Sequence, residues 1–340
     1  MSNNKATNQS SVLAVMRSKM PISASSVPKG MTLSEFANYW LQYLTPDLKV
    51  ATRYSYQSAF ANHINRVFFS MKLSDITSED VQLFTLSLTE GIDLDRPLSP
   101  KTVRNIHGVL HKCLQAAYQL KLIEENPAKH IMLPKQNKPE LIPMNNEQVI
   151  AFLNAIDGHP LEILFKLALF TGMRISELIG LTWDCFNFDD GNIRIYRQLS
   201  FDRFKKKYTF ASVKNNKPRT IYPARAVMCM MKQLHNKGSN SSFVFCGSDK
   251  NPHYTYATVR RPFDKIVKQI GMPEFRFHDL RHTYAVISIK AGVDLKTLSA
   301  AMGHHSVSFT LDTYAFALTD MKLESAKRMQ SFLNEQNIKI

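Results

Sequence analysis

The stretch that decides the fold is residues 171–178, which read Thr-Gly-Met-Arg-Ile-Ser-Glu-Leu. The glycine predicts a turn, and the residues after it predict a helix that begins near Arg174. The helix dipole disfavours a cation at the start of a helix. An arginine at this place therefore favours a functional role over a packing role.

A second motif, residues 278–283, reads His-Asp-Leu-Arg-His-Thr. On a helix, His278 and Arg281 are three residues apart, so both side chains leave from one face. His278 and His282 are four apart, a spacing that also suits zinc. The metalloprotease pattern, however, needs a glutamate directly after the first histidine, where this chain has Asp279. No third Cys or His ligand lies nearby in the sequence, so we expect no metal.

The third motif, residues 303–314, reads Gly-His-His-Ser-Val-Ser-Phe-Thr-Leu-Asp-Thr-Tyr. A single tyrosine on a helix is more often a packing residue than a nucleophile. Tyr314, however, follows two arginines, two histidines and a lysine-rich segment in a fixed order. These accompanying residues make Tyr314 the candidate nucleophile.

The charge balance indicates a polyanionic partner. The 340 residues include 43 Lys and Arg against 28 Asp and Glu, a net charge of +15. For such an excess, nucleic acid is the favoured partner and a generically basic protein the alternative. One acidic residue, Asp202, lies between Arg194 and Arg219. The basic residues of that segment are Arg194, Arg197, Arg203, Lys205, Lys206, Lys207, Lys214, Lys217 and Arg219.

Composition excludes several other classes. A hydrophobic content of 44% is typical of a globular protein. The four cysteines form no Cys-x-x-Cys pair, which fits a reducing compartment. Neither a signal peptide nor an apolar run long enough for a membrane span is present. We expect a soluble cytoplasmic protein, associated with the nucleoid and without a membrane partner.

The chain is long enough for two domains. Residues 1–30 are predicted to be a flexible basic tail, with a small DNA-contacting element as the alternative. Residues 31–130 are predicted to form a helical domain and residues 131–143 a linker rich in proline and lysine. The helices of this domain are expected from Thr32 or Ser34 to about Leu44, and at about Val50–Phe69, Ser78–Thr89 and Ser99–Leu122.

Residues 144–340 are predicted to form a mixed α/β domain that ends in a C-terminal helix at 318–335. Its strands are expected at Asn192–Gln198, Tyr208–Val213 and Arg219–Tyr222. Its helices are expected at Asn145–Ala155, Leu161–Phe170, Tyr254–Ile270, His278–Ala291, Leu295–Met302, Ser308–Ala317 and Thr319–Glu335.

In combination, these motifs resemble the tyrosine recombinase (phage integrase) family, most closely the integrases of phages and other mobile elements, from about Met31 to Ala317. The family's first arginine lies in a T-G-x-R-x-S-E-L pattern, matched at Arg174. Its H-x-L-R-H box matches at His278 and Arg281, and its L-G-H box matches at His304 with Met302 in place of Leu. The nucleophile then falls on Tyr314.

The catalytic lysine is the remaining member of the family's set. Residues 214–223, Lys-Asn-Asn-Lys-Pro-Arg-Thr-Ile-Tyr-Pro, are similar to the family's lysine pattern, which places Lys214 in the catalytic position. Lys217 and residues 205–207 compete for this role. For DNA binding we expect Lys205, Lys206, Lys207, Lys217, Arg219, Lys135 and Lys138.

The chemistry of phosphodiester transfer explains this set. Two guanidiniums, Arg174 and Arg281, can each present paired N–H donors to the oxygens of a phosphorane, in place of a metal ion. Tyr314 attacks and needs a proton acceptor, for which His278 is the favoured candidate. His304 is expected to donate a hydrogen bond to the phosphorane, and Lys214 to protonate the departing 5′-oxygen. Because one phosphoester replaces another, no cofactor is needed.

The resemblance implies an all-α, SAM-like core-binding domain and a mixed α/β catalytic domain, mainly helical with a small antiparallel sheet. It also implies a homotetramer on double-stranded DNA with inverted-repeat core sites, exchanging strands through a Holliday junction. As further partners, the resemblance implies a directionality factor or a host DNA-bending protein. Integration and excision of a mobile element is the favoured role, and Xer-like dimer resolution is the alternative. A type IB topoisomerase and an inactive DNA-binding regulator are weaker alternatives.

Overall fold

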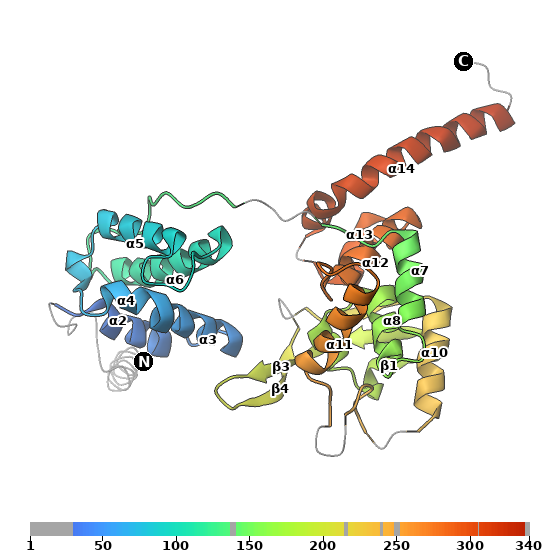
Figure 1. Ribbon diagram of the computed structural model, residues 1–340, viewed down its shortest axis with the longest axis horizontal. Coiled ribbons are helices and arrows are strands. Elements are labelled where there is room, and N and C mark those ends of the chain that lie inside the picture. Colours follow the sequence, from blue (N-terminus) through green and yellow to red (C-terminus); the bar gives the residue numbers. More distant parts are fainter. Residues whose placement is uncertain are drawn as a thin grey trace, which may run out of the picture. The chain divides into compact units, whose positions relative to one another are not determined.

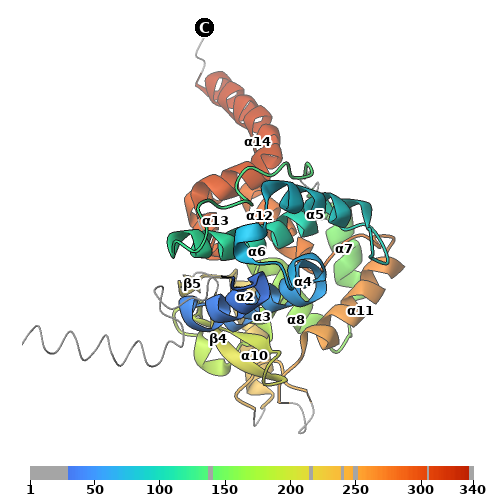
Figure 2. The ribbon, with the colours of Figure 1, turned by 90° about the vertical axis from the view of Figure 1, so that its left-hand side faces the viewer.

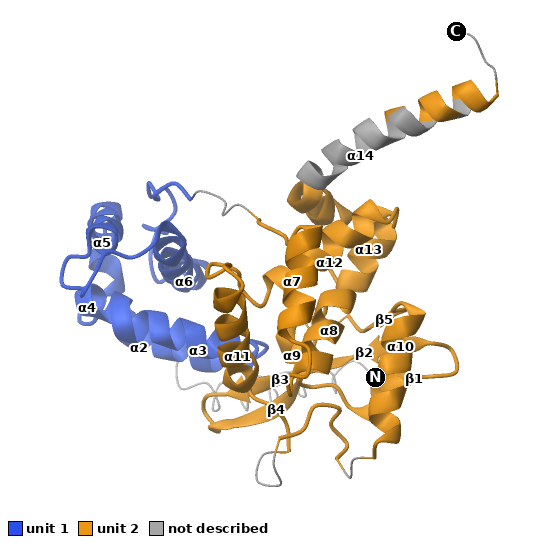
Figure 3. Cartoon of the chain, turned by 45° about the vertical axis from the view of Figure 1, so that its right-hand side comes forward, with its two compact units in different colours: residues 1–138 blue, residues 139–340 orange. Residues whose placement is uncertain are grey.

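The computed structural model describes residues 30–136, 141–213, 217–238, 241–247, 252–304 and 306–336. The chain divides into two compact units, Met1–Lys138 and Pro139–Ile340 (Figure 3). In its described part, the first unit is built of helices, and the second combines helices with two small antiparallel sheets. This confirms the fold class predicted from the sequence.

The helices of the first unit begin at residues that cap them. The Thr32 side chain accepts a hydrogen bond from the backbone N–H of Glu35, which settles the first helix start in favour of Thr32. Ser99 caps the last helix, and Pro100 occupies its first position. The elements are α2 (Leu33–Tyr39), η1 (Trp40–Leu44), α3 (Val50–Ala59), η2 (Phe60–Ile64), α4 (Asn65–Phe68), η3 (Leu73–Asp75), α5 (Ser78–Glu90) and α6 (Pro100–Gln119) (Figure 2).

Beyond α6 the chain remains attached to the first unit. The side chain of Asn126 donates to the carbonyl of His111 and accepts from the N–H of Ala128. Further along, Gln82 exchanges two hydrogen bonds with the backbone of Met132, and Nε of Arg104 donates to the carbonyl of Pro134 at 2.8 Å. These contacts hold the first part of the segment predicted as a linker against α5 and α6.

The sheets of the second unit come from residues 186–221. In one sheet, β2 (Asn192–Ile195) pairs antiparallel with both β1 (Phe186–Asn187) and β5 (Arg219–Ile221). The other is a hairpin of β3 (Arg197–Asp202) and β4 (Lys207–Ser212), which projects from the rest of the unit (Figure 1). The single strand predicted at residues 192–198 is therefore two strands, because its two ends pair with different partners.

Helices of the second unit carry most of its core. Phe152, Phe165 and Phe263 are fully buried and pack ring against ring across three helices. The helices are α7 (Asn146–Ala155), α8 (Glu162–Thr171), α9 (Ile175–Leu178), α10 (Arg225–Asn236), α11 (Tyr256–Gln269), α12 (Asp279–Lys290), α13 (Leu295–Met302) and α14 (Val307–Glu335) (Figure 1). The helix α10 was not predicted. No helix in the described part of the chain is long and apolar enough to cross a membrane.

Candidate active site

A buried carboxylate organises two arginines at the start of α9. Glu177 is 1% exposed, and its Oε1 accepts from Nη1 of Arg174 at 2.9 Å. Arg219, on β5, donates to both carboxylate oxygens of Glu177, at 2.8 and 2.7 Å. Burial raises the pKa of Glu177, but the hydrogen bonds and charges of Arg219 and Arg174 outweigh burial and hold the pKa at about 2. Glu177 is therefore ionised and fixes both guanidiniums.

The turn before α9 requires its glycine. Gly172 ends α8 in the left-handed region, with φ of +61°, where a side chain is strained. A Cβ at this position would also lie 2.4 Å from the ring of Tyr284. The carbonyl of Gly172 accepts a hydrogen bond from Nη1 of Arg281 at 2.7 Å. The turn thus links the first arginine motif to the second.

Arg281 is 3% exposed and lies on α12. Besides Gly172, it binds the carbonyl of Met302 through Nη2, and Arg174 binds the carbonyl of Gly303 next to it. Burial, with the nearby charge of Arg174, lowers the pKa of Arg281 to about 9. The side chain therefore remains charged at neutral pH. Each terminal nitrogen of a guanidinium carries two hydrogens, so these contacts leave N–H groups for a phosphate.

Tyr314 is completely buried at a break in α14, where its φ is −117° and its ψ is 20°. Its hydroxyl lies 2.8 Å from Nδ1 of His282. Burial raises the pKa of Tyr314 to about 12, although Arg281 opposes this rise. The hydroxyl is therefore protonated at neutral pH and needs a base to become a nucleophile.

Two further histidines complete the cluster. The ring of His304 lies nearly parallel to that of Tyr314, with centroids 6.5 Å apart, and its Nδ1 is 2.8 Å from the hydroxyl of Thr310. His278 meets His282 edge-on, with centroids 5.3 Å apart. Burial, followed by the nearby cationic groups, lowers the pKa of His278 to about 4 and that of His304 to about 3. Both rings are neutral at neutral pH.

The structure thus brings together five of the six predicted catalytic residues: Arg174, His278, Arg281, His304 and Tyr314. The sixth, Lys214, lies outside the described residues, as does Lys138 of the predicted DNA-binding set. Lys205, Lys206 and Lys207 are exposed at the tip of the β3–β4 hairpin, and Lys135 and Lys217 are also exposed.

The side chain of Arg219 is more buried than we expect for a residue that contacts DNA. Its side chain is 8% exposed, and besides Glu177 it binds the carbonyl of Ala301 through Nε at 2.7 Å. In this structure Arg219 shares the Glu177 carboxylate with Arg174. Its contact with DNA stays a prediction.

Sequence reasoning assigned no role to Glu177 and considered His282 only as a zinc ligand. A signal existed for both. Glu177 lies three residues after Arg174 at a helix start, where a glutamate can reach back to the preceding turn. His282 lies one helical turn after His278 and therefore shares its face. Within the described residues, no group of three or more His, Cys, Asp or Glu side chains is placed to hold a metal ion.

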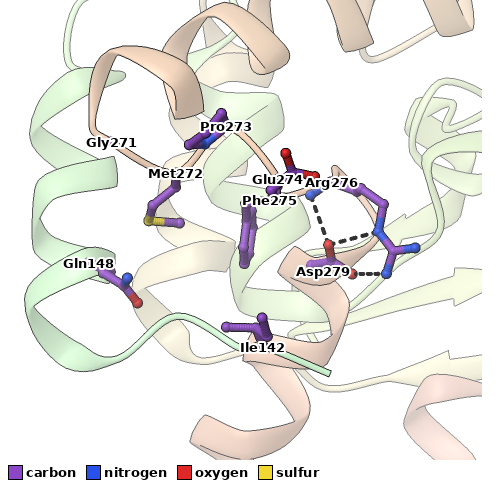
Figure 4. A pocket seen from close by; sticks show the side chains of 9 residues that line it. All are labelled: Ile142, Gln148, Gly271, Met272, Pro273, Glu274, Phe275, Arg276 and Asp279. Carbon is purple, nitrogen blue, oxygen red and sulfur yellow. Dashed lines mark hydrogen bonds and ion pairs between the residues drawn. The ribbon is translucent and has the colours of Figure 1, made fainter. Parts of the chain in front are cut away.

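A separate pocket of about 470 Å³ is lined mainly by the residues that precede α12 in the sequence (Figure 4). Asp279 and Arg276 line it, and Nη2 of Arg276 donates to Oδ1 of Asp279 at 2.8 Å. The other lining residues are Ile142, Gln148, Gly271, Met272, Pro273, Glu274 and Phe275. None of the predicted catalytic residues lines this pocket.

Comparison with protein families identifies the class. The model described as "Phage integrase family" matches residues 141–320, and the model described as "Phage integrase, N-terminal SAM-like domain" matches residues 32–88. The first match alone spans more than half of the 340 residues. The chain belongs to the phage integrase family and is a tyrosine recombinase, a DNA strand transferase.

Individual relatives are distant but extend over most of the chain. A protein named "Tyrosine recombinase XerC-like" from Caldanaerobacter subterraneus subsp. tengcongensis is 26% identical, over 88% of this chain and 83% of the relative. "Prophage integrase IntR" of Escherichia coli is 22% identical, over 89% of this chain and 80% of the relative.

Solved structures share the fold. The Tn1549 transposon integrase in complex with a circular intermediate DNA has a TM-score of 0.75 at 21% identity, covering 88% of this chain and 99% of that one. The lambda integrase tetramer bound to a Holliday junction has a TM-score of 0.60 at 18% identity, covering 82% and 79%. At these identities the likeness shows the fold alone.

Proposed function

We propose that this protein cleaves and rejoins DNA at specific sites through a 3′-phosphotyrosine formed on Tyr314. The observation that supports this most is the position of the Tyr314 hydroxyl, which is hydrogen-bonded to His282 and lies close to the buried guanidinium of Arg281. Arg174 and Arg281 clamp the non-bridging oxygens of the phosphorane, where negative charge develops. A neutral histidine takes the tyrosine proton, His304 hydrogen-bonds the phosphorane, and Lys214 protonates the 5′-oxygen as it leaves.

The biological role we propose is integration and excision of a mobile element. One relative supports it, because it is named a prophage integrase. Resolution of chromosome or plasmid dimers is the second candidate, since the XerC-like relative aligns over most of both chains. In either role the substrate is double-stranded DNA with inverted-repeat core sites.

Exposed lysines on separate elements supply the phosphate contacts in this proposal. Lys205, Lys206 and Lys207 lie at the tip of the β3–β4 hairpin, near the exposed aromatic residues Phe201 and Phe204. Lys135 follows the segment anchored to α6. Because each neutralised phosphate releases counterions, binding weakens steeply with salt.

The proposed function predicts recombination that depends on site and not on metal. DNA flanking the gene is searched for imperfect inverted repeats, and plasmids carrying the candidate sites are incubated with the protein in excess EDTA. We expect exchange between matched sites, because arginines perform the charge stabilisation that a metal would supply. Recombination that stops on chelation and returns with Mg²⁺ would contradict the mechanism. Relaxation of a plasmid without any site would favour a type IB topoisomerase.

Assembly provides a second test. We propose that the protein acts as a tetramer on two sites and that the end of α14 docks on a neighbouring copy. Met329 on this helix is 60% exposed, so its apolar side chain is available for contact with a neighbouring copy.

Met329→Glu is therefore expected to reduce synaptic complexes about tenfold on native gels, the effect of losing one interface anchor. Single-site binding should be unchanged. Ser331→Glu, which adds the same charge on the opposite face of the helix, is the control. Equal synapsis by Met329→Glu and the unchanged protein would show that this helix end packs elsewhere. Deletion of residues 319–340 should reduce synaptic complexes further, again with single-site binding unchanged.

A further inference from the structure

The hydroxyl of Tyr314 is bonded to a histidine that no motif assigned to catalysis. Nδ1 of His282 lies 2.8 Å from that oxygen, which is the distance of a well-formed hydrogen bond. His278, the histidine expected to be the base, instead presents its ring to His282 with the planes at 89°. His278 is the N-cap residue of α12, and His282 lies one helical turn later, next to the Tyr314 hydroxyl.

The protonation state of His282 allows it to accept a proton. Burial lowers the pKa of His282; the carboxylate of Asp279 opposes this, and the charges of Arg281 and Arg276 add to it. The ring is therefore neutral at neutral pH. In the tautomer that carries its hydrogen on Nε2, Nδ1 accepts a hydrogen bond from the Tyr314 hydroxyl. The titratable or charged groups that face this ring are Asp279, Arg276, Arg281 and His278 from α12 and the turn before it, Tyr314 from α14, and His304 from the turn after α13.

We propose that His282 is the general base for Tyr314, an inference that rests on the proposed recombinase function. As the Tyr314 oxygen bonds to phosphorus, its proton passes to Nδ1 of His282. The bond from phosphorus to the 5′-oxygen breaks, and that oxygen takes a proton from the general acid, for which Lys214 is the proposed residue. In the ligation step the 5′-hydroxyl attacks phosphorus and gives its proton back to the deprotonated general acid. The bond between phosphorus and Tyr314 breaks, and His282 returns its proton to the tyrosine oxygen.

The proton moves during the attack and not before it. In the resting site the transfer is unfavourable, because the pKa of Tyr314 is about 12 and that of His282 is below its usual value. The tyrosine oxygen loses its basicity as its bond to phosphorus forms, so the hydrogen bond to His282 becomes a path for the proton in the transition state. A hydrogen bond already made in the resting state places the base without further rearrangement of its own side chain.

Two substitutions at one position separate basicity from positioning. His282→Asn can keep a hydrogen-bonding atom near the place of Nδ1 but cannot take a proton, whereas His282→Ala loses both. The matched control is His278→Asn, which makes the same change one helical turn earlier. Each full-length variant is tested in single-turnover cleavage of a nicked duplex that carries the core site found in the recombination assay, after native gels have shown saturation of the DNA.

We expect both His282 variants to form the covalent adduct roughly 10²–10⁴-fold more slowly at pH 7, the usual contribution of a positioned base. The pH dependence of this rate is the second measurement. The unchanged protein needs neutral His282, so its rate falls only as pH drops below the lowered pKa and is level from pH 7 to 9. The rate of His282→Asn should instead climb about tenfold per pH unit over that range, because hydroxide or ionised tyrosine replaces the base.

A rate for His282→Asn within threefold of the unchanged protein, with a level pH profile, would overturn the inference and leave His282 a positioning residue. The inference would also be overturned if the cleavage rate climbed with pH for His278→Asn and stayed level for His282→Asn, because the base would then be His278. In either case Tyr314 would still form the adduct, so the proposed function would stand. If the unchanged protein forms no adduct on any candidate site, it is the proposed function that fails.

Discussion

Tyr314→Phe is expected to abolish covalent attachment to DNA while leaving DNA binding within about twofold, because a single hydroxyl is removed. This hydroxyl is the group that lies 2.8 Å from Nδ1 of His282. The measurement is a denaturing gel of the protein after incubation with a nicked suicide substrate. The structure adds a cost in stability, since the variant leaves Nδ1 of His282 without this partner in a buried site. Such a loss typically costs about 1–3 kcal/mol, visible as a lower midpoint of thermal unfolding.

The control is Tyr284→Phe on α12, which removes a hydroxyl from a tyrosine whose ring lies against Gly172. This variant should form the adduct at nearly the normal rate. A denaturant-resistant adduct with Tyr314→Phe would show that the nucleophile is another residue. Loss of DNA binding by Tyr314→Phe would instead indicate that the hydroxyl is needed for the folded site.

Local patterns in the sequence were sufficient to predict two arginines and a tyrosine that the structure brings together. Residues 278–283 predicted a helix that begins at His278, and the structure places His278 at the N-cap of α12, which begins at Asp279. The turn at Gly172 and the helix start at Arg174 were predicted from the same kind of signal. These features depend on neighbours within a few residues, which a single sequence displays directly.

Contacts between distant segments could not be predicted in the same way. His282 and Tyr314 are 32 residues apart, and nothing local shows that their side chains meet. Arg219 is equally instructive, because its place in a basic segment suggested DNA, whereas its partner Glu177 comes 42 residues earlier. The break between β2 and β3 has the same origin, since strand partners are chosen over long range.

The helix α10 was missed for a different reason. It begins soon after Pro223 and buries Val227, Met228 and Met231, at spacings that fit one helical face. The signal was therefore present. A short methionine-rich stretch between a strand and a polar segment gives only a weak signal for a helix, because methionine also suits irregular packing.

Lys214→Ala is expected to slow cleavage of ordinary DNA by about 10²–10⁴-fold, or roughly 3–5 kcal/mol of barrier, if Lys214 protonates the leaving 5′-oxygen. The same variant should recover nearly normal cleavage when sulfur replaces the bridging 5′-oxygen, because a thiolate leaves without a proton. Single-turnover rates on the two substrates measure this directly. The rescue is specific to a general acid, since it depends on the leaving group and not on the clamp around phosphorus.

Arg281→Ala supplies the contrast, because the phosphorane lacks one of its two guanidiniums whichever atom leaves. This variant should stay slow on both substrates, and a rescue by sulfur would mean that the arginine acts on the leaving group. Lys217→Ala and a triple alanine variant of Lys205, Lys206 and Lys207 test the competing lysines. These four side chains are exposed, so their loss should weaken DNA binding and its salt dependence more than the chemical step. If sulfur rescues one of these variants and not Lys214→Ala, the general acid is that lysine, and Lys214 is a DNA contact.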